Sequence, residues 1–261
     1  MKARKSRQPK RYTGNSKDQV VRYDKEGRKI DKEMKRLLKT TDEFETTSDT
    51  PIVLTIQNKS FRIRQTMSRS PDTENEKDPV TWYTETVCPG SPKLVCESLM
   101  NPKYRKKWDL NISSFEQIPM DPVFPNIFIH HTIADNRDGD YLSARDVVEL
   151  ISINEVEDKT SFQVSSKSID RKDIPKIRGF ARDNTMICGI LFEKLSPKER
   201  KKMKIPKLKK CEWTRIRYIL QTKNSDSLDH SGVNAAMAHT SDEMMKGLRN
   251  YIIQKRLKLD H

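Results

Sequence analysis

One pattern constrains the fold of this chain more than any other: a long series of alternating segments ends in a single amphipathic stretch. Apolar and polar side chains alternate in most segments between residues 51 and 222, which is typical of half-buried β-strands. Because several segments follow one another without an intervening helix, they are expected to pair antiparallel. Residues 231–258 then repeat apolar side chains at helical spacing. The order predicts an α+β fold in which a long C-terminal helix closes a curved antiparallel sheet over a cavity.

About nine strands are expected in this sheet. The segments that carry the strand pattern are 51–57, 60–67, 80–87, 126–134, 145–153, 160–169, 176–182, 185–193 and 212–222. Three helices are expected before the C-terminal one. The first lies within 18–45, where apolar residues form a loose stripe. The second covers 91–100, where serine and then proline begin the segment, and the third covers 104–108.

The last expected strand indicates how the sheet is solvated. Arg215 and Arg217 alternate there with Ile216 and Tyr218. One face of the sheet therefore tolerates charge and the other does not, which predicts one wet side and one covered side.

The C-terminal helix is the expected cover, and its composition is unusual for a core helix. Met237, Met244, Met245 and Leu248 fall on one stripe, and methionine adapts to irregular shapes. Small side chains, including Ala238 and Ser241, leave room where larger ones would fill the core. Ordinary core packing remains the alternative interpretation of these residues. Gly247 is expected to permit local opening of the helix.

Composition narrows the partners but does not name them. The 261 residues carry a net charge of +14, which favours phosphate-rich surfaces, either nucleic acid or an anionic membrane. The basic residues lie mainly in a tail and one loop, and aromatic residues (7%) do not interleave with them as in a stacking platform, so no nucleic-acid partner is expected. Residues 1–17 are expected to form a disordered basic tail, and residues 18–261 one domain.

Metal binding, membrane spanning and catalysis find little support in the sequence. The four cysteines have no metal-ligand spacing and are expected to be reduced thiols, and no apolar run approaches the ~18 residues that span a bilayer. His130 and His131 are adjacent on an expected strand, so they point to opposite faces. No nucleophile elbow and no zinc-protease motif occurs. We therefore expect no enzyme activity, cofactor or metal, and a hydrolase or isomerase on a related fold is the rival hypothesis.

A family resemblance rests on five stretches in a fixed order. They are Asn101-Pro102-Lys103-Tyr104-Arg105-Lys106-Lys107-Trp108-Asp109, Arg145-Asp146-Val147, Ile177-Arg178-Gly179, 214–220 and 234–249. Together they resemble the StAR-related lipid-transfer (START) family over residues 50–257. The resemblance implies a helix-grip fold that holds one lipid and transfers it between membranes, without making or breaking a bond. A lipid-sensing or regulatory module without transfer is the alternative.

Within the family, residues 128–134 and 145–146 look most like the sterol-binding branch. That branch places an acidic residue where this chain has Thr132 and an arginine where it has Ile151. Loss of both charges implies a neutral, more apolar cavity, because a single buried charge would cost several kcal/mol. A sterol is the favoured ligand, and a phospholipid is the second candidate.

The resemblance and the strand pattern together give an expected cavity lining. Its residues are His130, Thr132, Arg145, Val147, Ile151, Met186, Cys188, Ile216, Tyr218, Asn234, Met237, Ala238, Ser241, Met244, Met245 and Leu248. The C-terminal helix and the loop 169–176 are expected to form the lid.

Residues 197–210 are expected to contact the membrane. They include eight basic residues and one acid, and each basic side chain near an anionic leaflet contributes about 1 kcal/mol. The basic residues are Lys198, Arg200, Lys201, Lys202, Lys204, Lys207, Lys209 and Lys210. Met203, Ile205 and Leu208 are expected to insert shallowly, and a solvated loop is the alternative. The expected protein is a cytoplasmic monomer that associates peripherally with membranes.

Overall fold

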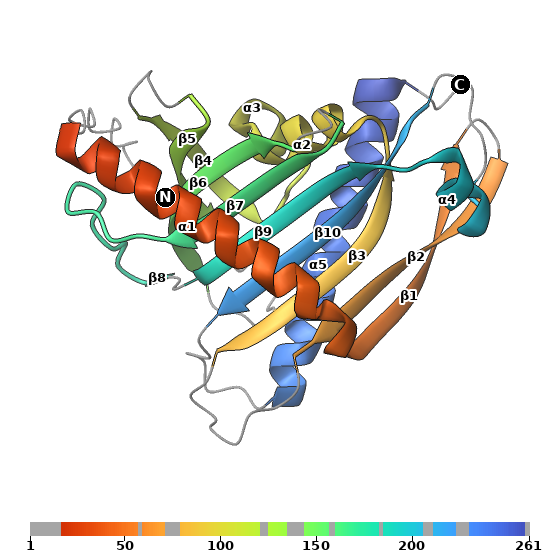
Figure 1. The fold of residues 1–261 in the computed structure, drawn as a ribbon, viewed down its shortest axis with the longest axis horizontal. Helices are drawn as coiled ribbons and strands as arrows, with labels where there is room; N and C mark the ends of the chain where they lie inside the picture. Colours follow the sequence, from red (N-terminus) through yellow and green to blue (C-terminus); the bar gives the residue numbers. More distant parts are fainter. Residues whose placement is uncertain are drawn as a thin grey trace, which may run out of the picture.

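The computed structural model describes residues 17–56, 59–70, 79–120, 125–134, 144–156, 160–182, 185–205, 211–222 and 230–258 (Figure 1). A large twisted sheet forms the centre of this part of the chain, with one long helix on each face.

The sheet is antiparallel and contains ten strands in the order β1-β2-β3-β10-β9-β7-β6-β5-β4, with short β8 paired parallel to β6. The strands are β1 Glu45–Ile56, β2 Lys59–Arg69, β3 Val80–Pro89, β4 Ile112–Pro119, β5 Ile127–Ala134, β6 Arg145–Glu155, β7 Phe162–Ser168, β8 Ala181–Arg182, β9 Thr185–Lys194 and β10 Trp213–Thr222. The sheet is open, with β1 and β4 at its edges. The expected α+β, helix-grip architecture is confirmed.

The C-terminal helix α5 (His230–Tyr251) and its π-helical continuation η2 (Ile252–Leu257) cover the concave face (Figure 1). Met245, Leu248 and Ile252 are fully buried there, in one cluster with Ile151 and Ile216 of the sheet. Short helices α2 (Pro92–Met100) and α3 (Pro102–Arg105) complete this cluster. Helix α2 begins as expected, because the Ser91 hydroxyl accepts a hydrogen bond from the Leu94 amide at 3.3 Å.

The opposite face of the sheet is also covered over much of its area, which corrects the expectation of a wet side. Helix α1 (Lys17–Thr40) lies across it (Figure 1), and Ile30 and Leu37 pack against Leu150 and Ile219. Arg215 and Arg217 lie on the same face beyond this cluster, and Arg217 pairs with Glu193 at 2.8 Å. The alternation in β10 therefore predicted that the concave face is covered, but it did not predict that α1 covers much of the opposite face.

Met34 fixes the position of α1 on the sheet. Its side chain is fully buried over Gly189 of β9, so close that a Cβ on Gly189 would lie 2.4 Å from Met34 Cγ. Glycine at this position makes the close approach of helix and sheet feasible.

Replacing Gly189 with valine is therefore expected to lower the free energy of unfolding by about 1–3 kcal/mol, because the added methyl groups force α1 away from the sheet. Urea unfolding at neutral pH measures the change. Gly179→Val is a matched comparison for space, since nothing lies within 4 Å of a Cβ there, although its φ of +88° adds backbone strain. If Gly189→Val is as stable as the unchanged protein, the close packing of Met34 on Gly189 is contradicted.

Three elements differ from the sequence prediction. Strand β4 was missed because a bulge between Ile112 and Ser114 breaks its alternation. The expected strand 176–182 reduces to two residues, because Gly179 takes a positive φ and the Ile177 amide bonds to the Asp146 carboxylate instead. Helix α4 (Pro197–Lys202) was expected as a loop, although Ser196 and Glu199 form a capping box that the sequence already displays.

Candidate functional site

A row of polar side chains crosses the concave face of the sheet beneath α5. Tyr218 on β10, Cys188 on β9, Ser166 on β7 and Glu149 on β6 come from adjacent strands. The Ser166 hydroxyl donates a hydrogen bond to Glu149 Oε1 at 2.9 Å. The hydrophobic cluster beside them includes Ile151, so the polar row adjoins an apolar wall.

Glu149 adds an ionisable carboxyl group to the face of the sheet that was expected to line a neutral cavity. Strand β6 has no irregularity in its pairing with β5, so Glu149 shares the concave face with Val147 and Ile151. Val147 and Ile151 were both expected in the lining, and Glu149 lies between them on the same face. That alternation was the signal that could have identified this carboxylate.

Arg105 brings a positive charge to the same region. Its guanidinium pairs with Asp109 at 2.9 Å, lies 5.4 Å from the ring centres of Trp108 and Phe115, and reaches Met244 Sδ of α5 at 3.6 Å. These contacts join the arginine, tryptophan and aspartate of this stretch into one cluster. The motif fastens α3 to α5 and holds the guanidinium over the concave side.

Trp108 also explains Gly247 in α5. A Cβ on Gly247 would lie 3.0 Å from Trp108 Cε3, and the indole donates a hydrogen bond to the Ser98 carbonyl at 3.1 Å. Glycine at this position therefore makes room for the buried Trp108 ring. The sequence had suggested instead that Gly247 permits local opening of the helix.

Cys188 and Tyr218 of the polar row lie deep in the protein, yet their side chains keep solvent-accessible surface. Burial raises the pKa of the Cys188 thiol to about 12 and raises the pKa of Tyr218 well above its usual value. Both side chains nevertheless retain accessible surface, and so do Thr132 and Val147 on neighbouring strands. Close-packed interiors leave almost no such surface.

His130 lies at the buried end of β5. It is 2% exposed between the rings of Phe115 and Phe128, whose centres are 4.5 and 4.9 Å away. Burial, helped by the nearby Arg105 charge, lowers the pKa of His130 to about 3, so the imidazole is neutral at physiological pH. Its Nε2 has no hydrogen-bond partner within the described residues.

The other expected lining residues divide into three groups. His130, Ile151, Ile216, Ser241, Met245 and Leu248 are buried, whereas Thr132, Arg145, Val147, Cys188, Tyr218 and Met244 are half-buried. Met186 is half-buried at an irregularity in the pairing of β9 with β10. The side chains of Asn234, Met237 and Ala238 lie outside the described residues.

A polar seam joins α5 to strands β2 and β3. Ser241 and Thr84 lie within hydrogen-bond distance at 3.3 Å, and the Gln65 amide donates to Asp242. Arg249 is 1% exposed and donates to the Val87 carbonyl at 3.0 Å and to Gln65 Oε1 at 2.8 Å. Burial lowers the pKa of Arg249 to about 10. These bonds fix the C-terminal half of α5 to the sheet.

The loop expected to act as a lid is fastened to the side of the sheet that faces α1. Ile174 is 3% exposed in the cluster with Ile30 and Leu150. Asp146, which has no exposed surface, accepts hydrogen bonds from Arg182 at 2.7 Å and from the Ile177 amide at 3.1 Å. The Ile169 amide also donates a hydrogen bond to the Val148 carbonyl at 2.9 Å, so both ends of the loop are anchored.

The expected membrane-contact residues lie partly on α4. Lys198, Lys201, Lys202 and Lys204 are exposed, Arg200 is half-buried, and Lys207, Lys209 and Lys210 lie outside the described residues. Ile205 is 6% exposed and Met203 packs against the same cluster, around Trp213, so these two side chains anchor the segment to the core. The burial of Ile205 argues against its expected insertion into a membrane, insertion of the half-buried Met203 stays a prediction, and Leu208 lies outside the described residues.

Within the described ranges, no helix is long and apolar enough to cross a bilayer, and no group of histidine, cysteine and acidic side chains has the arrangement of a metal site.

Solved structures with the same architecture include three StAR-related proteins. The human StAR-related lipid transfer protein 5 is 17% identical, with a TM-score of 0.69 over 90% of this chain and 98% of that one. Human STARD10 is 16% identical, with a TM-score of 0.63 over 85% of this chain and 79% of that one. A StAR-related lipid transfer protein from Xanthomonas axonopodis is 11% identical, with a TM-score of 0.56 over 81% and 99%. At these identities the likeness concerns the fold.

Sequence comparison places the chain more specifically. No curated protein sequence shows significant similarity to it. The family model of the START domain, however, matches residues 65–251, which is more than half of the chain and contains both the polar row and all of α5. The chain therefore belongs to the START domain family.

Proposed function

We propose that this protein binds one lipid between the concave face of its sheet and α5, and transfers it between membranes. The observation that carries the proposal is the accessible surface of Cys188 and Tyr218 in a region deep enough to raise both pKa values. Surface of this kind is expected where side chains border an unfilled interior space. Membership of the START family and the names of its structural relatives, which describe lipid transfer proteins, support the same conclusion.

A sterol is the proposed ligand, with a phospholipid as the second candidate. A sterol needs one polar partner for its hydroxyl group and an apolar wall for its body. Glu149, Ser166 and Tyr218 supply hydrogen-bonding groups on the concave face, and the cluster around Ile151 and Ile216 supplies the wall. The acid of the sterol-binding branch is missing at Thr132, and Glu149 supplies a carboxylate from the neighbouring strand.

Transfer follows from the energetics of lipid desorption. At ~0.8 kcal/mol per CH₂ group, a body of about twenty carbons faces a barrier near ~16 kcal/mol on leaving a bilayer. An apolar interior next to the membrane removes much of that exposure. The seam at Ser241, Asp242 and Arg249 holds the C-terminal half of α5 to the sheet. We therefore propose that the N-terminal half of α5 opens for the lipid.

Helix α4 is the proposed site of peripheral contact with anionic membranes. Replacing Lys201 and Lys202 with glutamine is expected to slow transfer from anionic vesicles roughly thirtyfold, because each lysine contributes about 1 kcal/mol near an anionic leaflet. Transfer from neutral vesicles should change little. The control replaces Lys32 and Lys35, exposed on α1, with the same loss of charge. Equal slowing from both kinds of vesicle would remove α4 as the contact site.

The proposed function is tested with donor and acceptor vesicles that carry a fluorescent sterol or a fluorescent phosphatidylcholine. The expected result is catalysed transfer of sterol at a rate proportional to protein concentration, with slower transfer of phosphatidylcholine. Transfer of neither lipid, with no lipid retained by the protein, would contradict the proposal.

A further inference from the structure

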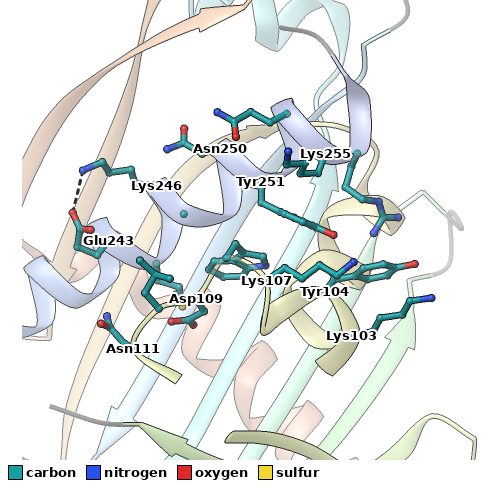
Figure 2. Close-up of a pocket in the computed structure, with 16 residues that line it drawn as sticks. Lys103, Tyr104, Lys107, Asp109, Asn111, Glu243, Lys246, Asn250, Tyr251 and Lys255 are labelled. Carbon is teal, nitrogen blue, oxygen red and sulfur yellow. Dashed lines mark hydrogen bonds and ion pairs between the residues drawn. The ribbon is translucent and has the colours of Figure 1, made fainter. Parts of the chain in front are cut away.

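A groove lies on the side of α5 that faces α3 (Figure 2). Helix α3 and the turn after it form one wall, and the C-terminal half of α5 with η2 forms the other (Figure 2). The groove encloses about 950 Å³. Figure 2 shows Tyr251 projecting from α5 toward Tyr104 and Lys107 on the opposite wall. None of the polar row on the concave face lines this groove.

The groove has an excess of positive charge. Its lining includes five cationic side chains, which are Lys103, Lys107, Lys246, Lys255 and Arg256, and two carboxylates, Asp109 and Glu243. Each carboxylate already has a cation: Asp109 pairs with Arg105 at 2.9 Å, and Glu243 with Lys246 at 3.3 Å. Across the described ranges, Lys103, Lys107 and Lys255 make no ion pair. Such a concentration of unneutralised lysines attracts anions.

The Tyr104 ring holds the Arg256 guanidinium in place. The Arg256 guanidinium lies 4.2 Å from the centre of the Tyr104 ring and 3.4 Å from the Glu97 carboxylate. Lys103 approaches the same ring at 6.0 Å. Stacking on the ring limits the motion of the guanidinium, and a guanidinium presents paired donors to phosphate oxygens.

One exposed apolar side chain stands at the rim. Leu110 lines the groove and is 74% exposed, one of two large apolar residues that the described part of the chain leaves mostly in solvent. Lysines beside an exposed leucine are typical of surfaces that bind the interface of an anionic membrane. A soluble anion would give this leucine no partner, so the combination favours a lipid headgroup at a membrane.

We propose that the groove between α3 and α5 binds the phosphorylated headgroup of an anionic membrane lipid. Lys103, Lys107 and Lys255 contact the phosphate groups, Arg256 contributes a positioned guanidinium, and Leu110 enters the bilayer interface. This surface is separate from α4 and does not depend on which lipid the interior holds.

The test uses full-length protein and co-sedimentation with three kinds of vesicle: phosphatidylcholine alone, phosphatidylcholine with phosphatidylserine, and phosphatidylcholine with phosphatidylinositol bisphosphate at matched charge. The expected result is a preference for the phosphoinositide over phosphatidylserine. Replacing Lys103 and Lys107 with glutamate should weaken phosphoinositide binding about thirtyfold or more and abolish the preference.

Lys93 and Lys106 supply the matched control. Both are exposed, both belong to the same α2–α3 region, and neither lines the groove. Their replacement with glutamate changes the net charge by the same amount and is expected to keep the preference. Equal loss in the two double variants would show that net charge alone governs binding and would overturn the proposal.

Leu110→Ser separates a membrane headgroup from a free anion. It is expected to weaken vesicle binding and to leave the binding of soluble inositol trisphosphate unchanged. Full vesicle binding by this variant, or soluble inositol trisphosphate and inorganic phosphate binding as tightly as vesicles, would overturn the membrane assignment. Sterol transfer between neutral vesicles by the Lys103/Lys107 variant serves as the independent readout of the interior site, so either proposal can fail alone.

Discussion

Replacing Asp146 with alanine is expected to lower the free energy of unfolding by about 3–5 kcal/mol at neutral pH, the typical cost of removing one partner from a buried ion pair. The Asp146 carboxylate has no exposed surface and accepts hydrogen bonds from Arg182 and Ile177, and His131 Nε2 lies 3.0 Å from its Oδ1. Its removal leaves the Arg182 guanidinium buried without its carboxylate and breaks the hydrogen bond that holds Ile177 just after the loop 169–176. Urea unfolding followed by circular dichroism measures the change.

The pH dependence of this effect has a definite sign. Desolvation raises the pKa of Asp146, but the hydrogen bonds from Arg182, Ile177 and His131 outweigh it, so the pKa lies below its usual value of 3.8. A lowered carboxyl pKa contributes stability that is complete above the unfolded pKa and is lost as pH falls through the folded pKa. The stability difference between the unchanged protein and Asp146→Ala should therefore shrink below about pH 4.

An exposed ion pair provides the comparison. Asp49 and Arg64 lie 3.6 Å apart, and their side chains are 41% and 76% exposed. Asp49→Ala is expected to cost less than about 1 kcal/mol. Similar losses for Asp49→Ala and Asp146→Ala, or an Asp146 effect that does not change with pH, would contradict the assigned role of Asp146.

Replacing Val147 with tryptophan is expected to abolish lipid uptake while leaving the fold stable. Val147 lies on the concave face opposite Thr132, is half-buried, and belongs to no packed cluster of the described residues. A large ring at this position would occupy the space proposed for the lipid instead of displacing neighbours. Uptake of fluorescent sterol and the midpoint of thermal unfolding are the two measurements.

The neighbouring residue is a matched control. Val148 points to the opposite face and is fully buried in the cluster beneath α1. Val148→Trp overpacks that cluster and is expected to lower stability by at least 1–3 kcal/mol. If Val147→Trp destabilises the protein as much as Val148→Trp does, the space next to Val147 is already filled and the proposed lipid site is wrong.

The sequence predicted the architecture because its alternation is regular where the strands are regular. Strand β10 pairs with β3 over its full length without a shift, and its pattern is unambiguous. Strand β4 carries a bulge after Ile112, and the alternation that would have identified it disappears there. Helix α1 was recognised as a helix, but its position over Gly189 depends on a close contact with Met34 that no local pattern encodes.

The site was less accessible to sequence reasoning, for two reasons. Glu149 was readable from the alternation of β6, but the expectation of a neutral cavity was drawn from two other positions, Thr132 and Ile151. Arg105 reaches the interior from a short helix far away in sequence, and its contact with Met244 follows only from the packing of α3 on α5. The groove between α3 and α5 has the same origin, since its two walls are about 140 residues apart in sequence.

Native mass spectrometry of the full-length protein, after equilibration with vesicles that contain sterol and phosphatidylcholine, tests the central claim most directly. The claim is that one lipid occupies the space between the concave face and α5. The predicted result is a single sterol adduct per chain that is absent from Val147→Trp. A protein that stays at its unliganded mass, or that carries the same lipid in both forms, would contradict it.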